Sequence, residues 1–146
     1  MELYNIGEET MKTIDEYIQM YEKHTKEKFQ FNTGFSFFYH PEHGFCEYKI
    51  EDTGLYIWQL CGDLKYWVDI GYKVCRQFEL SSMSAYILRK PKPFIRALGF
   101  KIESEECKDG YRRYHCINKA GEKLTATQYG KKYIFVWRIR GGKNNE

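Results

Sequence analysis

The chain has 146 residues, a length typical of one domain, and its 42% hydrophobic and 29% charged residues lie near the average for globular proteins. Only three prolines and twelve glycines are present, which excludes collagen-like and linker-like chains. The formal charge of +3 is too small to predict a nucleic-acid partner by itself. We expect one domain over residues 1–140 and a flexible polar tail at 141–146.

The ends and the cysteines predict a protein of a reducing, cytoplasm-like compartment with no membrane association. Residues 1–10 carry acids where a signal peptide needs a basic and then an apolar segment. The longest apolar run, 133–137, is far shorter than a membrane span. The five cysteines are odd in number and form no C-x-x-C motif, which favours reduced, mostly buried thiols.

The first half predicts a strand, a helix and a three-stranded meander. Residues 3–6 are expected to form a short strand, and residues 8–26 a helix with one apolar stripe. Alternating apolar residues follow between 35 and 60, interrupted by turn-forming residues at 41–44 and 52–54. This pattern is typical of three antiparallel strands.

The second half begins with a change of period. Apolar residues recur every three or four positions over 63–80, which predicts an amphipathic helix with Asp63 as its cap. A short strand at 83–88 follows, then a short helix with Pro93 in its first turn and Gly99 at its end. Three or four further strands are expected after it.

These elements predict an α+β fold with a mixed, mostly antiparallel sheet. Residues 56–60 and 83–88 should be neighbouring parallel strands at its centre, joined by helix 63–80 as a right-handed crossover. Helices should flank this pair, and a β-hairpin should end the chain.

The element order, together with the segment AYILRKPKPFIRALGFKIES, resembles the GCN5-related N-acetyltransferases (GNAT). Residues 86–88 match the family's fifth strand, 93–98 its short fourth helix, and Gly99-Phe100 the start of its sixth strand. The match covers roughly residues 1–118, and the hairpin at 124–140 looks like an addition. A closer resemblance is to the degenerate GNAT-like proteins of bacteriophages and mobile elements, which also have a Gly-Asp pair and a basic run, here Gly62-Asp63 and residues 89–93.

The sequence also departs from the family at its catalytic positions. The family loop Q/R-x-x-G-x-G/A binds the diphosphate of coenzyme A, but here residues 60–65 retain one glycine, Gly62. Asp63 places a negative charge where the diphosphate would lie, and Ile95 stands where the family often has a tyrosine acid. If acetyl-CoA binds at all, the resemblance implies Gly62, Asp63 and Lys65 as its contacts; we expect no cofactor and no catalytic residue.

Histidines and cysteines supply three candidate chemical sites. His40, His43 and Cys46 have metal-like spacing, but a fourth ligand is missing nearby, so we interpret them as two turn histidines and a buried thiol. Cys61, just before a helix, is the best candidate for a reactive thiol, although an inward residue at a strand end is the favoured interpretation. Cys107, His115 and Cys116 are interpreted as core thiols beside an edge histidine.

Basic residues gather between positions 81 and 102, where no acid occurs. The candidate partner-binding residues there are Arg89, Lys90, Lys92 and Arg96. They favour an acidic or phosphate-rich partner, whereas ordinary solvated charges are the alternative.

The predicted function is therefore non-catalytic binding of another protein, either a virion component or a host or defence factor. The chain would then work in the host cytoplasm or in the virion. A diverged acyl-CoA-dependent N-acyltransferase is one alternative, and a phosphate or nucleic-acid binder that uses a basic face is another.

Overall fold

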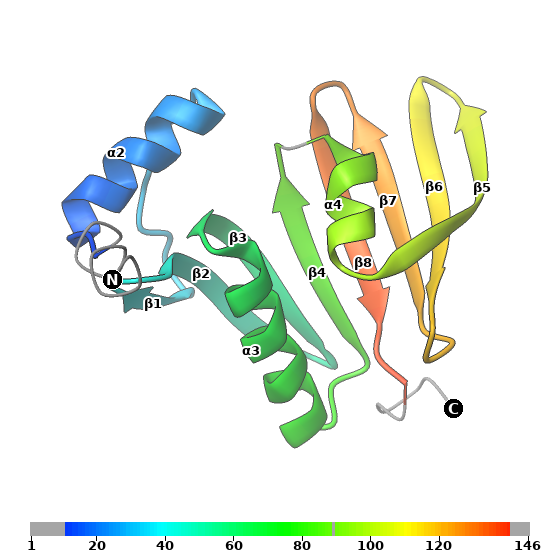
Figure 1. The fold of residues 1–146 in the computed structure, drawn as a ribbon, viewed down its shortest axis with the longest axis horizontal. Helices are drawn as coiled ribbons and strands as arrows, with labels where there is room; N and C mark the ends of the chain where they lie inside the picture. Colours follow the sequence, from blue (N-terminus) through cyan, green and yellow to red (C-terminus); the bar gives the residue numbers. More distant parts are fainter. Residues whose placement is uncertain (1–10, 89, 141–146) are drawn as a thin grey trace, which may run out of the picture.

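The computed structural model describes residues 11–88 and 90–140, and it is an α+β fold. Its eight strands form one mixed sheet in the order β1-β2-β3-β4-β8-β7-β6-β5 (Figure 1). The strands are β1 (Ser36–His40), β2 (Gly44–Glu51), β3 (Gly54–Gly62), β4 (Ser82–Ile87), β5 (Phe100–Lys108), β6 (Tyr111–Asn118), β7 (Lys123–Tyr129) and β8 (Lys132–Arg138). The described helices are α2 (Ile14–Thr25), α3 (Leu64–Gln77) and α4 (Pro91–Ala97). None of these three is long and apolar enough to cross a membrane.

The N-terminal half confirms the predicted meander. Strands β1, β2 and β3 pair antiparallel in chain order. Helix α2 begins at Ile14, later than predicted, because the Thr13 hydroxyl accepts the Glu16 backbone N–H while the Glu16 carboxylate accepts that of Thr13. The strand predicted at residues 3–6 lies outside the described residues.

The central parallel pair is also confirmed. Strands β3 and β4 are parallel, with Gly54 opposite Ser82 and Ile57 opposite Ala85, and α3 connects them. Asp63 caps α3 as predicted, since its side chain accepts the backbone N–H of Tyr66. The helix ends at Gln77, three residues before the predicted end, and Glu79 takes a left-handed conformation with φ of 55°.

The C-terminal strands differ from the expected added hairpin. Strand β8 pairs with β4, and β7 follows β8, so this hairpin lies inside the sheet rather than outside it. Strand β5 consequently lies at one edge. The reason is apolar burial: Phe135 and Trp137 of β8 pack under the helices, and a central position covers them best.

The helices cover the two faces of the sheet unequally. Helices α3 and α4 lie on the same face, as Figure 1 shows, and their side chains share one core cluster with Phe135 and Trp137. Helix α2 lies on the opposite face, where Tyr21 contacts Phe45 at 5.6 Å between ring centroids. It covers only the β1–β3 half, so the β4–β8 half of that face carries none of the three described helices.

A buried carboxylate joins α3 to the C-terminal strands. Glu122 is 3% exposed, and its oxygens accept hydrogen bonds from the Tyr72 hydroxyl (3.0 Å), the Asn118 amide (2.9 Å), the Trp137 indole (3.2 Å) and the Arg140 backbone N–H (2.9 Å). Burial raises the pKa of Glu122, but these donors outweigh it, so the pKa lies below its ordinary value.

Replacing Glu122 with glutamine should therefore destabilise the fold at neutral pH by about 2–3 kcal/mol. The amide accepts hydrogen bonds through only one oxygen, and its NH2 group faces donors that the second carboxylate oxygen had satisfied. Since the folded pKa is depressed, this stabilisation is fully present above the unfolded pKa of about 4.3 and is lost as pH falls through the folded pKa. Urea unfolding at about pH 7 and about pH 3 should show the difference between wild type and variant shrinking in acid.

The matched control is Glu103→Gln, which removes one carboxylate from an exposed ion pair with Lys123. Its effect should stay below about 0.5 kcal/mol. An equal loss in both variants would show that the Glu122 hydrogen bonds contribute nothing specific.

Candidate binding site

The site is formed where β3 and β4 separate. The two strands pair only as far as Ile57 and Ala85, and Trp58 is an extra residue in β3, because Tyr48 pairs with Ile57 while Glu47 pairs with Gln59. Such a bulge bends a strand and ends its pairing. The tips of the β3 and β4 arrows consequently point away from each other (Figure 1).

Helix α2 closes one side of this gap and leaves a cavity of about 390 Å³. Met20, Tyr21 and His24 line it from α2, and Trp58 and Tyr86 line it from the two strands. Burial raises the pKa of Tyr21 to about 12, so this phenol is neutral at physiological pH. The cavity can therefore accept an apolar or aromatic group with a few polar contacts.

An aromatic pair forms the outer wall of the cavity. The rings of Trp58 and Tyr86 stack at 4.9 Å between centroids, and the Lys132 ammonium lies 5.4 Å above the Tyr86 ring. Trp58 remains 45% exposed. Large aromatic side chains held in place at a cavity rim are typical of binding hot spots. Neither Trp58 nor Tyr86 was predicted as a site residue, although the aromatic content of β3 was visible in the sequence.

Cys61 agrees with the favoured interpretation as an inward residue at a strand end. It is 6% exposed, packs in the cluster under α2, and its thiol donates to the Tyr17 carbonyl at 3.4 Å. Cys61 also lines the cavity, but its thiol proton is directed at this backbone carbonyl.

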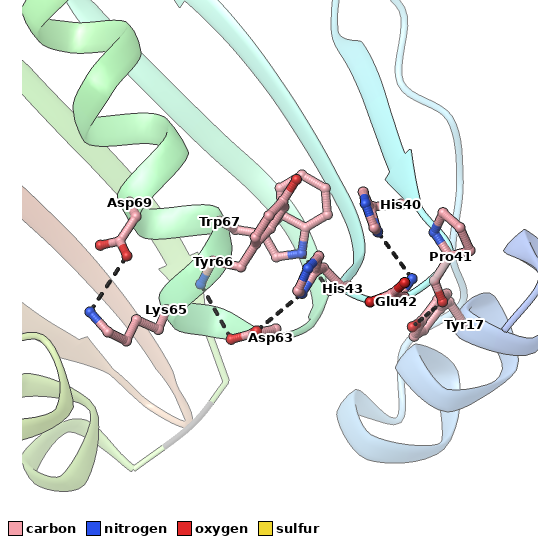
Figure 2. A network of polar contacts seen from close by, with 10 residues as sticks. All are labelled: Tyr17, His40, Pro41, Glu42, His43, Asp63, Lys65, Tyr66, Trp67 and Asp69. Carbon is pink, nitrogen blue, oxygen red and sulfur yellow. Dashed lines mark hydrogen bonds and ion pairs between the residues drawn. The ribbon is translucent and has the colours of Figure 1, made fainter. Parts of the chain in front are cut away.

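The three residues expected to contact acetyl-CoA do not converge. Asp63 accepts the Tyr66 backbone N–H through one oxygen and lies 3.2 Å from His43 Nδ1 through the other (Figure 2). Gly62 has φ of 104° and packs directly against the backbone of β2. Lys65 points away from both, with its ammonium 3.5 Å from Asp69. A carboxylate thus occupies the start of α3, where a diphosphate would need free N–H donors.

Ile95, which stands where the N-acetyltransferases often have a tyrosine acid, is inaccessible to a substrate as well. Ile95 lies on the inner side of α4 and is fully buried in the main core cluster. It supplies neither a proton nor a surface for a substrate.

The described basic residues of the segment 89–96 are all exposed. Helix α4 begins at Pro91 instead of Pro93, and its buried side carries Phe94 and Ile95. Lys92 and Arg96, one turn apart, are both exposed, as is Lys90. None of these three takes part in an ion pair among the described residues, and the Lys92 ammonium lies 5.9 Å from the Tyr114 ring. Arg89 lies outside the described residues.

The chain links the cavity to the start of the basic segment. Leu88 lines the cavity, and Lys90 follows two residues later at the start of α4. Lys90, Lys92 and Arg96 are named below as the basic patch. Of these three, Lys90 is nearest the cavity along the chain, whereas Lys92 extends to the Tyr114 ring of β6, three strands beyond β4 in the sheet order.

The histidine and cysteine groups are separated by the fold. The rings of His40 and His43 lie 4.6 Å apart near α3, and Figure 2 shows both at the turn that joins β1 to β2. Cys46 is buried, and burial raises its pKa to about 12. Within residues 11–88 and 90–140, no three potential ligands gather at one point.

The thiols near the β5–β6 turn are divided as well. Cys116 is a core thiol, and His115 contacts Glu106 at 3.0 Å near the sheet edge, as interpreted from the sequence. Cys107, in contrast, is exposed rather than part of the core.

Comparison with known proteins adds no relative: no family model, no curated protein and no solved structure matches this chain.

Proposed function

We propose that this chain is a non-catalytic GNAT-like protein of phage or mobile-element origin that acts by binding another protein, either a virion component or a host or defence factor. The resemblance of its element order and of residues 86–100 supports the family and the origin. The bulge in β3 and the separation of β3 from β4 support a binding role at that point.

The observation that carries the proposal is the cavity between α2, β3 and β4 with an aromatic stack at its wall. Its wall presents the Trp58–Tyr86 stack, in which Trp58 is 45% exposed, and Leu88 of its lining precedes Lys90 by two residues. A protein partner can place one apolar side chain in the cavity and an acidic residue near Lys90 at the start of α4. Such an anchor with a charged rim is the usual arrangement of a compact protein interface.

The arrangement around α3 supports binding without catalysis. The Asp63 carboxylate would repel a diphosphate, Ile95 is buried, and Cys61 donates to a backbone carbonyl. Each of these positions would have to rearrange before acyl transfer from coenzyme A became possible.

Filling the cavity tests the proposal. The Met20→Trp side chain should occupy the cavity without removing a hydrogen bond. It should lower the affinity for a partner captured from source-cell lysate at least about tenfold. Met11→Trp is the matched control, because Met11 is exposed outside the cavity. The affinity of the purified partner for each variant would be measured by calorimetry. If both variants bind it as wild type does, the cavity is not the interface.

A diverged acyl-CoA-dependent N-acyltransferase is the second candidate, and the cavity between the separated strands is the observation that favours it. We expect no heat of acetyl-CoA binding at submillimolar concentration, because the Asp63 carboxylate occupies the start of α3. Binding that Lys65→Glu abolishes, or acetyl transfer to any amine that Cys61→Ser abolishes, would replace the first proposal with the second.

A further inference from the structure

The two edges of the sheet differ in chemistry. Among the described residues, β1 and β5 each have a strand on one side only. An edge strand presents unpaired backbone N–H and C=O groups, and proteins usually protect it with charges, prolines or bulges. The two edge strands differ in these protections.

Strand β5 is protected. It carries Lys101, Glu103, Glu105, Glu106 and Lys108, and its pairing with β6 shifts register near Ile102. Two copies of this strand, paired antiparallel about Ser104, would place Glu103 opposite Glu105. Like charges in directly opposed positions are destabilising.

Among the described residues, β1 has none of these protections. The segment before α2 hydrogen-bonds to it only near its end, where the Lys12 backbone N–H donates to the Pro41 carbonyl and the Tyr39 hydroxyl donates to the Lys12 carbonyl. The sequence of β1 is SFFYH, without lysine, acid or proline, and its pairing with β2 runs without interruption from Ser36–Tyr48 to His40–Gly44. Phe38 is 46% exposed at its centre. An exposed, regular and aromatic edge favours the addition of another strand.

We propose that β1 pairs with β1 of a second copy of this chain, antiparallel about Phe38. In this register Phe38 faces its counterpart, Phe37 faces Tyr39 of the other copy, and Ser36 faces His40. Every opposed pair except Ser36–His40 is aromatic, and aromatic cross-strand pairs are stabilising. No carboxylate or lysine is brought against its like, in contrast to β5.

The surroundings of Phe38 favour the same occupant. An apolar cavity of about 140 Å³ lies between α3 and β1–β3, and Phe38 lines it together with Trp67, 5.5 Å away between ring centroids. A two-fold axis perpendicular to the sheet keeps α3 of both copies on one face. The two Phe38 rings and the two cavities then meet, and apolar surface leaves water on both copies.

Sedimentation velocity at increasing protein concentration tests this pairing. Wild type should form a dimer at micromolar concentration, and Phe38→Lys should raise the dimer dissociation constant about a hundredfold. The matched control is Phe78→Lys, because Phe78 is also an exposed phenylalanine, 57% accessible, but lies at the end of α3. This control should dimerise as wild type does.

The register has its own measurement. In a background with Cys46→Ala and Cys107→Ser, which removes the thiol opposite Phe38 and the exposed native thiol, Phe38→Cys should give a covalent dimer under mild oxidation on a non-reducing gel, whereas Phe78→Cys should not. A monomeric wild type at about 100 µM overturns the proposal. So does a dimer that survives Phe38→Lys, one that Phe78→Lys disrupts equally, or one that Phe38→Cys does not cross-link. None of these results depends on the proposed protein partner.

Discussion

Replacing Gly44 with alanine should cost about 4 kcal/mol of folding stability. Gly44 has φ of 103°, which an alanine adopts only with strain of about 1 kcal/mol. Its position opposite Gly62 brings the two backbones so close that an added Cβ would collide with the Cys61 carbonyl. Because that carbonyl belongs to a paired strand, the whole strand end must shift. Urea unfolding measures the loss.

Gly34→Ala separates the collision from the backbone strain. Gly34 has a similar φ of 88°, but an added Cβ would meet no atom within 4 Å. This control should lose about 1 kcal/mol, the conformational part alone. Equal losses in the two variants would show that the close approach of β2 and β3 contributes nothing.

Reversing the charges of the basic patch should have the largest effect on binding. Lys92→Glu with Arg96→Glu should lower the affinity for the captured partner about a hundredfold, because attraction between α4 and acidic residues of the partner becomes repulsion. Wild-type affinity should also fall with added salt, as screening requires. Folding should be unaffected, since both side chains are exposed and outside the ion pairs of the described residues.

The matched control carries the same change of net charge elsewhere. Lys73→Glu with Lys101→Glu alters exposed residues of α3 and β5. Calorimetry with the purified partner should give this control the same affinity as wild type. If both double variants weaken binding equally, only net charge matters; if neither does, the patch is an ordinary solvated surface.

Local patterns predicted much of the fold. The turns at 41–44 and 52–54 fixed the meander, because their residues favour tight turns between alternating strands. The parallel pair followed from the change to a helical period between two strands. Asp63 was recognised as a cap because its position directly precedes the apolar repeat.

Long-range features were missed for physical reasons. The alternation of Tyr56, Trp58 and Leu60 suggested one face, but the bulge at Trp58 puts Leu60 near the α3 cluster and Cys61 under α2. A bulge changes which residues share a face and leaves no clear local signal. The central position of β8 likewise depends on pairing with β4, about 50 residues earlier, which no local pattern encodes.

The candidate site was predicted only in part. Lys90, Lys92 and Arg96 were predicted as a charge cluster, and the structure places Lys92 and Arg96 on the exposed side of α4, with Lys90 at its N-cap. The cavity itself required side chains from α2, β3 and β4 to meet, which depends on tertiary packing. The stack of Trp58 on Tyr86 depends on how β3 and β4 are arranged in the sheet, so the sequence alone did not identify these two as site residues.

The most direct measurement of the central claim is site-specific photo-cross-linking to the captured partner. A benzophenone amino acid at position 58 would lie at the cavity rim, and the same group at position 78 would lie at the far end of α3. The cavity model predicts an adduct with the partner from position 58 and none from position 78. An adduct from position 78 and none from position 58 would contradict it.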